Sequence, residues 1–230
     1  MRRFLERHLG DVAGLGTYSQ QGEDAVLWHL LSEKGHGFYV DVGAHHPRRY
    51  SNTYFFYRRG WSGLNIDATP GSMKPFDLER PRDINIEAAI GTAVGPLTYY
   101  IFNEPALNGF SQTLPGPLQG SDYFRVIGQL SIVPRRLDEV LRERLSPGQL
   151  IDFMTIDVEG VDLEVLTSND WERFRPRFVV VEDNAVFYID DVERSSVGQF
   201  MASLGYGCCA KTKHTMIFAD KTRASAIPRL

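Results

Sequence analysis

Short apolar runs alternate along the chain with segments of helical period. The apolar runs are rich in aromatic and β-branched residues and are therefore predicted to be buried strands. They occupy residues 38–43 (FYVDVG), 62–68 (SGLNIDA), 83–91 (DINIEAAIG), 149–160 (QLIDFMTIDVEG) and 177–184 (RFVVVEDN). The first two runs stop at lone acids, Asp41 and Asp67. A strand that ends on a carboxylate suggests that this end faces a ligand.

Helical periods fill the intervals between these strands. The predicted helices lie within residues 19–37, 52–60, 72–81, 135–145 and 161–174. In the first of them Ser19 can cap the N-terminus, a stripe of valine and leucine side chains marks the buried face, and a glycine ends the helix. Gly60 and Pro81 end the second and third.

The end of the chain has a different pattern. Residues 206–212 (YGCCAKT) and 214–220 (HTMIFAD) are two strands joined by a tight polar connection, which predicts a hairpin. Strands that alternate with helices predict a parallel sheet with helices on both faces. The fold class is therefore α/β, a Rossmann-like, doubly wound, mostly parallel sheet to which the C-terminal hairpin adds an antiparallel strand.

Length and composition narrow the functional classes. A chain of 230 residues is predicted to form one domain. The net charge of -4 gives no general attraction to nucleic acid or anionic lipid. No run approaches the roughly 18–20 apolar residues that span a bilayer, and residues 1–17 are expected to form a short amphipathic helix rather than a signal peptide. The two cysteines, Cys208 and Cys209, are predicted to be packed thiols of a reducing compartment, and the location is predicted to be cytoplasmic.

Residues 104–134 form a long excursion with glycines and prolines and without a sustained period. Excursions of this length are more often functional than simple connections. We expect a lid over the substrate, in which Asn108 and Ser111 donate hydrogen bonds to a polar acceptor and Phe110 offers an apolar face to a sugar ring. A solvated loop with one anchoring aromatic is the alternative.

The residues after the first strand suggest a cofactor cradle. Gly43 lets the backbone approach a ligand, Asp41 can accept hydrogen bonds from a cationic group, and Asp67 lies at the position of an acid that holds ribose hydroxyls. A dinucleotide site would need G-x-G-x-x-G and no acid aimed at the pyrophosphate. S-adenosylmethionine is therefore favoured over NAD. Acids that only cap turns remain the alternative.

Five motifs follow one another along the chain: YSQQGED, YVDVGAHHP, SNTYFFYRRGWSGLNID, TIDVEG and VVVED. Taken in order, they resemble the FkbM family of S-adenosylmethionine-dependent methyltransferases, and the likeness runs from about residue 18 to 220. The resemblance implies a seven-stranded class I methyltransferase fold. It also implies O-methylation of hydroxyls on sugars, polysaccharide or glycolipid precursors, or polyhydroxylated natural products. Many members have an asparagine and a further glycine where this chain has His45-His46-Pro47.

The resemblance also implies which residues bind the cofactor. They belong to the ends of the first four strands and to two loops that fold over the methionine carboxylate. The set is Gln20, Asp41, Gly43, Ala44, Asn52, Thr53, Asp67, Ala68, Glu87, Ala88 and Asp157.

Two routes suit removal of the acceptor's proton. In the first, His45 or His46 acts as a general base, because an imidazole with a pKa near neutrality can take the proton as the new bond forms. The alternative for this pair is hydrogen bonding within a surface turn before Pro47.

In the second route a divalent cation binds and orients the acceptor. Asp157 and Glu159 follow the fourth strand, and Glu182, Asp183 and Asn184 follow the fifth. Oxygen ligands of this kind suit Mg²⁺, Mn²⁺ or Ca²⁺, and Asp157, Asp183 and Asn184 resemble the metal site of catechol-type O-methyltransferases. Turn chemistry is the alternative, because Asp and Asn are favoured after strands.

The sequence thus predicts an O-methyltransferase acting on a small molecule or glycan, with no nucleic-acid partner and no membrane span. A non-catalytic cofactor-binding scaffold or sensor is the competing class, and a nucleotide-dependent oxidoreductase is the weaker enzymatic alternative. The oligomeric state is left open, a homo-oligomer included.

Overall fold

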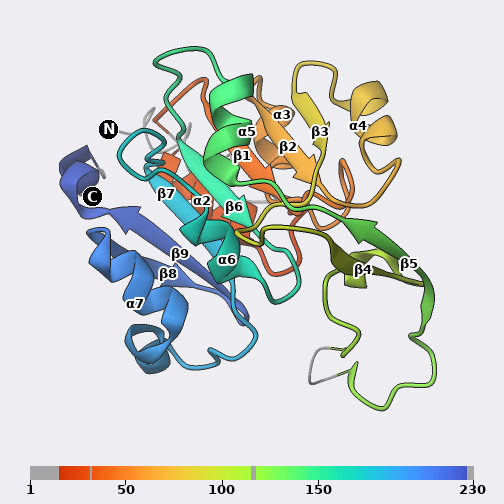
Figure 1. The fold of residues 1–230 in the computed structure, drawn as a ribbon. Coiled ribbons are helices and arrows are strands. Elements are labelled where there is room, and N and C mark those ends of the chain that lie inside the picture. Colours follow the sequence, from red (N-terminus) through yellow and green to blue (C-terminus); the bar gives the residue numbers. More distant parts are fainter. Residues whose placement is uncertain (1–15, 32, 115–117, 227–230) are drawn as a thin grey trace.

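A seven-stranded sheet forms the centre of the molecule (Figure 1). The computed structural model describes residues 16–31, 33–114 and 118–226. The strand order is β3-β2-β1-β6-β7-β9-β8. Five strands are mutually parallel: β1 (Phe38–Val42), β2 (Ser62–Asp67), β3 (Ile84–Glu87), β6 (Phe153–Ile156) and β7 (Phe178–Glu182). The strand β9 (Thr215–Asp220) runs antiparallel to both of its neighbours, β7 and β8 (Tyr206–Lys211). The predicted doubly wound sheet with its C-terminal hairpin is confirmed.

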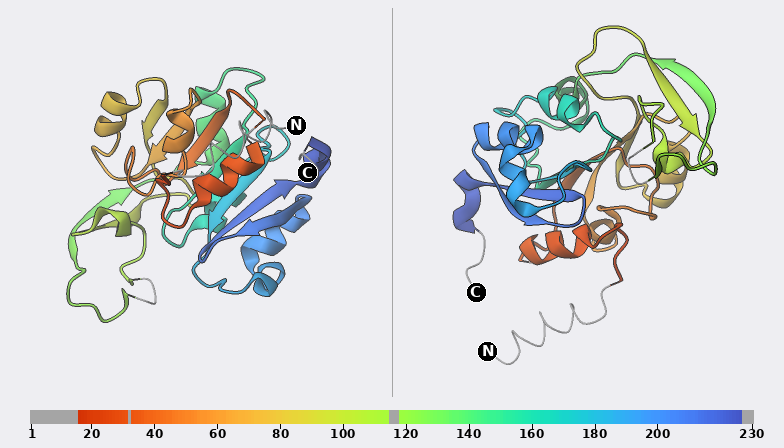
Figure 2. Two further views of the ribbon diagram at one scale, coloured as in Figure 1. Left: turned by 180° about the vertical axis from the view of Figure 1, so that it is seen from behind. Right: turned by 90° about the horizontal axis from the view of Figure 1, so that it is seen from below.

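Helices cover both faces of this sheet, because successive strand residues point to opposite sides. Figures 1 and 2 show α2 (Glu23–Leu31) and α3 (Tyr54–Tyr57) on one face and α5 (Leu137–Arg144), α6 (Asp162–Thr167) and α7 (Ser196–Ser203) on the other. On β1, Tyr39 belongs to the core under α2 and α3, whereas Val40 belongs to the core under α5 to α7. The helix α4 (Met73–Glu79) lies beside β3.

A second, two-stranded sheet projects beside the carboxyl ends of the central strands (Figure 1). It pairs β4 (Leu97–Phe102) with β5 (Val126–Ile132) in antiparallel register. The short 3-10 helix η1 (Pro105–Leu107) follows β4. The strand β5 lies inside residues 104–134, where the sequence predicted an irregular excursion. Most positions of β5 are exposed, and apolar and polar residues do not alternate regularly along it, so its sequence lacks the period of a strand. Its strand conformation accompanies the pairing with β4.

Three other expectations need comment. The predicted helix 1–17 lies outside the described residues except for its last two. The helix α7 and the preceding 3-10 helix η3 (Ile189–Arg194) were not predicted, in part because Gly198 interrupts the apolar period. That glycine is needed, because a Cβ there would lie 1.8 Å from the Val192 carbonyl oxygen. The expectation of packed cysteines is wrong: Cys208 and Cys209 are free and exposed on β8, at the edge of the sheet.

Candidate active site

A cleft lies where the carboxyl ends of β1, β2, β3 and β6 meet the β4–β5 sheet. Its volume is about 740 Å³, including the space that opens to solvent. Ligands of doubly wound sheets bind at this edge. The cleft brings together many of the predicted site residues: Gln20, Gly43, His45, Asp67, Ala68, Ala88, Asn108, Phe110, Asp157 and Glu159.

Gly43 makes the close turn after β1. Its φ is +86°, and a Cβ at this position would lie 1.7 Å from the Asp157 carbonyl oxygen. The turn therefore requires glycine both for its left-handed conformation and for the contact with the neighbouring strand end. The Gly43 amide donates to the Ile66 carbonyl across 2.9 Å, which fastens this turn to β2.

Asp67 ends β2 and organises the loops around it. Its two carboxylate oxygens accept hydrogen bonds from the amides of His45, at 2.9 Å, and Thr69, at 2.8 Å. The side chain is buried. Each carboxylate oxygen has a second acceptor site, so a ligand hydroxyl in the cleft can still donate to Asp67.

The two histidines have different environments. His45 lines the cleft with a φ of +52°, and its Nε2 is buried without a hydrogen-bond partner among the described residues. Burial lowers the pKa of His45 below its ordinary value, so its ring is neutral at pH 7. His46 does not line this cleft. Its Nδ1 accepts hydrogen bonds from the amides of Arg48 and Arg49, at 3.0 and 3.1 Å, within the turn that contains Pro47.

Three acids converge at the ends of β6 and β7. One oxygen from each of Asp157, Glu159 and Glu182 lies within 4.8 Å of the others, close enough to share one cation. Glu182 keeps a proton that it donates to Asp157, while the Asp157 Oδ1 is buried with no partner in the part of the chain that the structure describes.

Burial is the main cause that raises the pKa of each acid in this group; repulsion from Glu23 adds to it for Asp157, against the hydrogen bond with Glu182, which lowers it. The pKa of Glu159 is raised to about 8 and that of Glu182 to about 10, in both cases mainly by burial and then by the charge of Asp157. Asp162, which accepts hydrogen bonds from the Val158 and Gly160 amides, has a pKa raised to about 7, again mainly by burial. Some of these carboxyl groups are therefore protonated at neutral pH, and the site carries less negative charge than its number of acids would allow.

The predicted ligands Asp183 and Asn184 do not join this group of acids. Asp183 accepts a hydrogen bond from the Ala185 amide at 3.0 Å, as a residue that starts a turn does. Asn184 is exposed and its Nδ2 donates to Glu182 across 3.2 Å. The cation-sized group therefore contains Glu182 in place of the predicted Asp183 and Asn184.

Several predicted cofactor residues lie beneath or beside the cleft rather than on its surface. Ala44 packs against Met73 and Phe76, and the Asn52 Nδ2 donates to the Thr155 hydroxyl at 2.9 Å. Glu87 is exposed and accepts a hydrogen bond from the Gly71 amide. None of these three residues lines the cleft.

Asp41 and Thr53 also lie behind this surface. Thr53 is fully buried, and its hydroxyl donates to the Asp41 Oδ2 at 2.7 Å. Burial raises the pKa of Asp41 to about 6, against the hydrogen bond from Thr53 and the charge of Arg80, which lower it.

The β4–β5 sheet supplies the outer wall. Asn108 is fixed by two hydrogen bonds: its Oδ1 accepts from the Phe102 amide at 2.8 Å, and its Nδ2 donates to the Thr69 hydroxyl at 3.2 Å. Phe110 makes an edge contact with Tyr99, with 5.2 Å between the ring centroids. The predicted Ser111 is exposed, and its hydroxyl bonds within its own turn to Thr113.

Sequence reasoning missed two residues around the site, Tyr50 and Arg80. Tyr50 lines the cleft with a φ of +57°, which is costly for an aromatic residue, and stays 46% exposed. No sequence motif points to Tyr50 or Arg80. Glu182 was named as a candidate together with Asp183 and Asn184, and as the last residue of β7 it is the one that joins Asp157 and Glu159.

Comparisons with known proteins bear on what occupies this cleft. The sequence profile described as "Methyltransferase FkbM domain" matches residues 41–208. A comparison with curated proteins gives no match. No helix among the described residues has the length and apolar character needed to cross a membrane.

Three solved structures illustrate the structural likeness. The TehB-like SAM-dependent methyltransferase from Corynebacterium glutamicum is 10% identical, with 96% of this chain and 97% of that chain covered and a TM-score of 0.44. Methyltransferase FkbM from Methylobacillus flagellatus is 11% identical, with 80% of this chain and 44% of that chain covered and a TM-score of 0.47. Precorrin-6y C5,15-methyltransferase from Geobacter metallireducens is 11% identical, with 85% of this chain and 84% of that chain covered and a TM-score of 0.39.

Proposed function

The chain belongs to the FkbM methyltransferase family, and on that premise we propose that it transfers the methyl group of S-adenosylmethionine to a hydroxyl of a sugar or another polyhydroxylated acceptor. The observation that carries the proposal is the cleft itself. It joins a strand-ending acid suited to a ribose, a glycine turn, and two of the three grouped acids, Asp157 and Glu159.

The cleft residues fit the chemical groups of this cofactor. Asp67 has acceptor capacity left for ribose hydroxyls after binding two backbone amides. Ala88 and its neighbours offer a small apolar wall to the adenine. The unpartnered, buried Asp157 Oδ1 suits a cationic methionine end, because a buried acceptor without a donor is costly until a ligand satisfies it. When bound, the cofactor supplies an activated methyl group, so the protein has to position the acceptor and receive its proton.

His45 is the general base in this proposal. Its ring lines the cleft, is neutral at pH 7, and has a nitrogen without a hydrogen-bond partner among the described residues, whereas the Nδ1 of His46 accepts hydrogen bonds within its own turn. A neutral imidazole within reach of the acceptor can accept a proton at Nε2. The backbone amide of His45 donates a hydrogen bond to Asp67. The same carboxylate therefore positions the proposed base and contributes to the proposed cofactor site.

A divalent cation is the second element of the proposal. Asp157, Glu159 and Glu182 provide an all-oxygen ligand set that suits Mg²⁺, Mn²⁺ or Ca²⁺. A cation here would offset the repulsion among the three carboxyls and would draw the acceptor oxygens to this end of the cleft. Phe110 and Tyr50 are available for the apolar face of a sugar ring.

The test is a calorimetric titration with S-adenosylhomocysteine, with NAD⁺ as a control and with and without Mg²⁺, followed by a methyl-transfer assay on glycosides and polysaccharide precursors. Binding of S-adenosylhomocysteine alone, with turnover on a polyol, supports the proposal. Binding without turnover on any polyol favours the scaffold or sensor, and binding of NAD⁺ alone would favour the oxidoreductase. Loss of turnover on chelation, restored by Mg²⁺, supports the cation.

A further inference from the structure

A buried arginine lies behind the cleft and belongs to none of the roles given above. Arg80 follows α4 directly, and its side chain is completely buried. A buried guanidinium is costly unless all its donors are satisfied. The environment of Arg80 satisfies them with acceptors from three separate segments of the chain.

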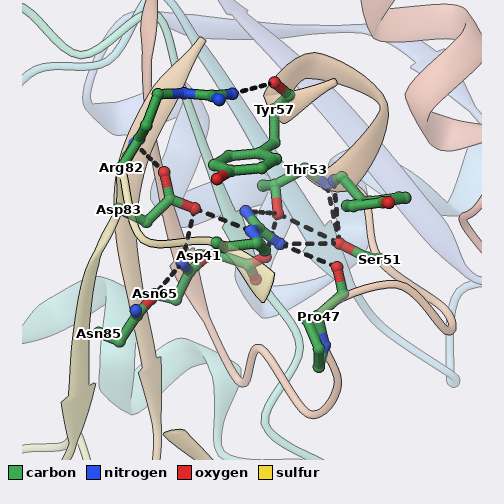
Figure 3. Close-up of polar contacts among 12 residues, drawn as sticks. Asp41, Pro47, Ser51, Thr53, Tyr57, Asn65, Arg82, Asp83 and Asn85 are labelled. Atoms are coloured by element: carbon green, nitrogen blue, oxygen red, sulfur yellow. Dashed lines mark hydrogen bonds and ion pairs between the residues drawn. The ribbon is translucent and has the colours of Figure 1, made fainter. Parts of the chain in front are cut away.

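Each nitrogen of the guanidinium has a defined partner. Nε donates to Asp83 at 2.8 Å, and Nη2 donates to the Tyr39 hydroxyl at 2.8 Å and to the Thr53 hydroxyl at 2.9 Å. Nη1 makes two longer bonds, to the Pro47 carbonyl at 3.3 Å and to the Ser51 hydroxyl at 3.4 Å. Dashed lines in Figure 3 trace these contacts toward Pro47, Ser51 and Thr53.

The Thr53 hydroxyl links Arg80 to Asp41. A threonine hydroxyl has one proton to donate. Because the Asp41 carboxylate can only accept, that proton is directed to the Asp41 Oδ2, 2.7 Å away, while the Thr53 oxygen accepts from Arg80. Figure 3 shows Asp41 and Thr53 side by side in this arrangement. Arg80 thus stabilises the Asp41 carboxylate through a hydroxyl, without touching it.

The remaining contacts hold the loop that carries the cleft residues. Pro47 and Ser51 flank Tyr50, and His45 lies two residues before Pro47. His45 and Tyr50 both have positive φ, a conformation that persists only where the surroundings enforce it. Arg80 bonds to the loop on both sides of Tyr50. The same side chain therefore supports the loop and the charge of Asp41.

We propose that Arg80 and Thr53 are positioning residues for cofactor binding: they hold Asp41 as a hydrogen-bonded carboxylate behind the Gly43 turn and fix the loop from His45 to Thr53 in its binding conformation. The inference rests on the proposed function, because it presumes that the cleft binds the cationic cofactor. A carboxylate held ionised just behind the cleft favours a ligand that carries an ammonium and a sulfonium group.

Removal of the Thr53 hydroxyl is the sharpest test. Thr53→Val keeps the shape of the side chain but deletes the bond to Asp41, and Thr53→Ser keeps the hydroxyl. We expect Thr53→Val to bind S-adenosylhomocysteine about tenfold or more weakly at pH 7, the range expected for loss of a hydrogen bond to a charged group. Thr53→Ser should bind as the wild type does.

The pH profile separates positioning from a general loss of structure. Asp41 faces Arg80 from the end of α4, Asp83 from the start of β3 and Asp157 from the end of β6. Binding by the wild type should weaken as the pH falls through about 6, where Asp41 takes up a proton. Because the Thr53 hydrogen bond lowers the pKa of Asp41, the Thr53→Val midpoint should move to higher pH while that of Thr53→Ser stays in place.

Arg82→Lys is the matched control. Arg82 is exposed, packs on the Tyr57 ring and donates to the Tyr57 carbonyl, so it lies in the same region but has no bond to Thr53 or Asp41. Its affinity and pH midpoint should equal those of the wild type. Thermal unfolding of every variant shows whether it folds, and Thr53→Ala removes the same hydroxyl if Thr53→Val does not.

The outcomes are distinct. Wild-type affinity and an unchanged midpoint in Thr53→Val, or equal losses in Thr53→Val and Thr53→Ser, would overturn the positioning role. Failure of the wild type itself to bind S-adenosylhomocysteine would overturn the proposed function instead.

Discussion

Because the acids at the ends of β6 and β7 have raised pKa values, we predict that the free energy of unfolding falls as the pH rises. The variant Glu182→Gln tests this prediction. Glu182 has a folded-state pKa raised to about 10, mainly by burial and then by Asp157 and Glu159. The folded protein therefore keeps a proton on Glu182 at neutral pH, whereas the unfolded chain releases it near its ordinary pKa. The raised pKa thus costs stability above that ordinary value, and the cost grows with pH until the folded-state pKa is reached.

The size of the effect follows from the linkage relation. A carboxyl that stays neutral in the folded state costs about 1.4 kcal/mol for each pH unit above its ordinary pKa. Between pH 5 and pH 7 this amounts to about 2.7 kcal/mol for one such group. Glutamine is neutral at every pH and its amide can donate to Asp157 as the protonated glutamate does. Glu182→Gln should therefore remove most of this loss.

The assay is urea unfolding of both proteins at pH 5 and pH 7 in the presence of a chelator, which keeps divalent cations out of the comparison. At pH 5, only slightly above the ordinary pKa of a glutamate, the cost of keeping Glu182 neutral in the folded state is about 1 kcal/mol, so this pH is the internal reference. From pH 5 to pH 7 the stability advantage of the variant over the wild type should grow by about 2 kcal/mol. An identical decline from pH 5 to pH 7 in both proteins would refute the reasoning.

Three further predictions concern the cleft. Asp67→Ala should weaken S-adenosylhomocysteine binding at least about tenfold in calorimetry, because it removes the ribose acceptor and the support of the His45 amide; unchanged affinity would contradict the assignment. Gly43→Ala should lower the free energy of unfolding by at least about 2 kcal/mol in urea, because of its φ of +86° and the 1.7 Å approach to the Asp157 carbonyl. His45→Asn should reduce turnover about 100-fold or more while cofactor binding persists, and His46→Asn should stay within a few-fold of the wild type; equal activity in both would eliminate the base.

The topology explains why strand ends could be predicted from the sequence. Once the alternation of strands and helices indicates parallel strands, their carboxyl ends must share one edge. Gly43, Asp67, Ala88 and Asp157 were each chosen as strand-ending residues, and all four line the cleft. Their exact contacts did not enter into that prediction. Their roles toward a cofactor stay predictions.

Residues in turns were harder to assign, because a shift of one residue changes which side chain faces the cleft. Glu182 is the last residue of β7 and joins the acids, whereas Asp183 begins the turn and bonds to the Ala185 amide. Adjacent histidines differ in the same way: only His45 lines the cleft, since its left-handed backbone turns the chain there. Neither difference can be predicted from the composition of the segment or from its hydrophobic period.

Arg80 illustrates a third limit. Its acceptors come from β1, the loop after it, and the start of β3, so no local pattern contains them. A lone arginine near the end of a short helix is normally read as an exposed side chain. Only the packed structure reveals that it is buried and that Thr53 lies between it and Asp41.

The acids at the ends of β6 and β7 lower the stability of the folded protein, and this cost is explained if they serve a function. Three carboxyl oxygens within 4.8 Å of one another, with raised pKa values, weaken the folded state at neutral pH in the absence of a ligand. Glu182→Gln would remove most of this loss of stability with almost no change in the shape of the side chain. Stability alone therefore does not explain why a glutamate occupies this position. A bound cation or cationic ligand would explain it, because it stabilises the ionised form that burial disfavours. Glu182→Gln should therefore gain stability and lose turnover together; a variant that gains stability and keeps full turnover would exclude Glu182 from the reaction.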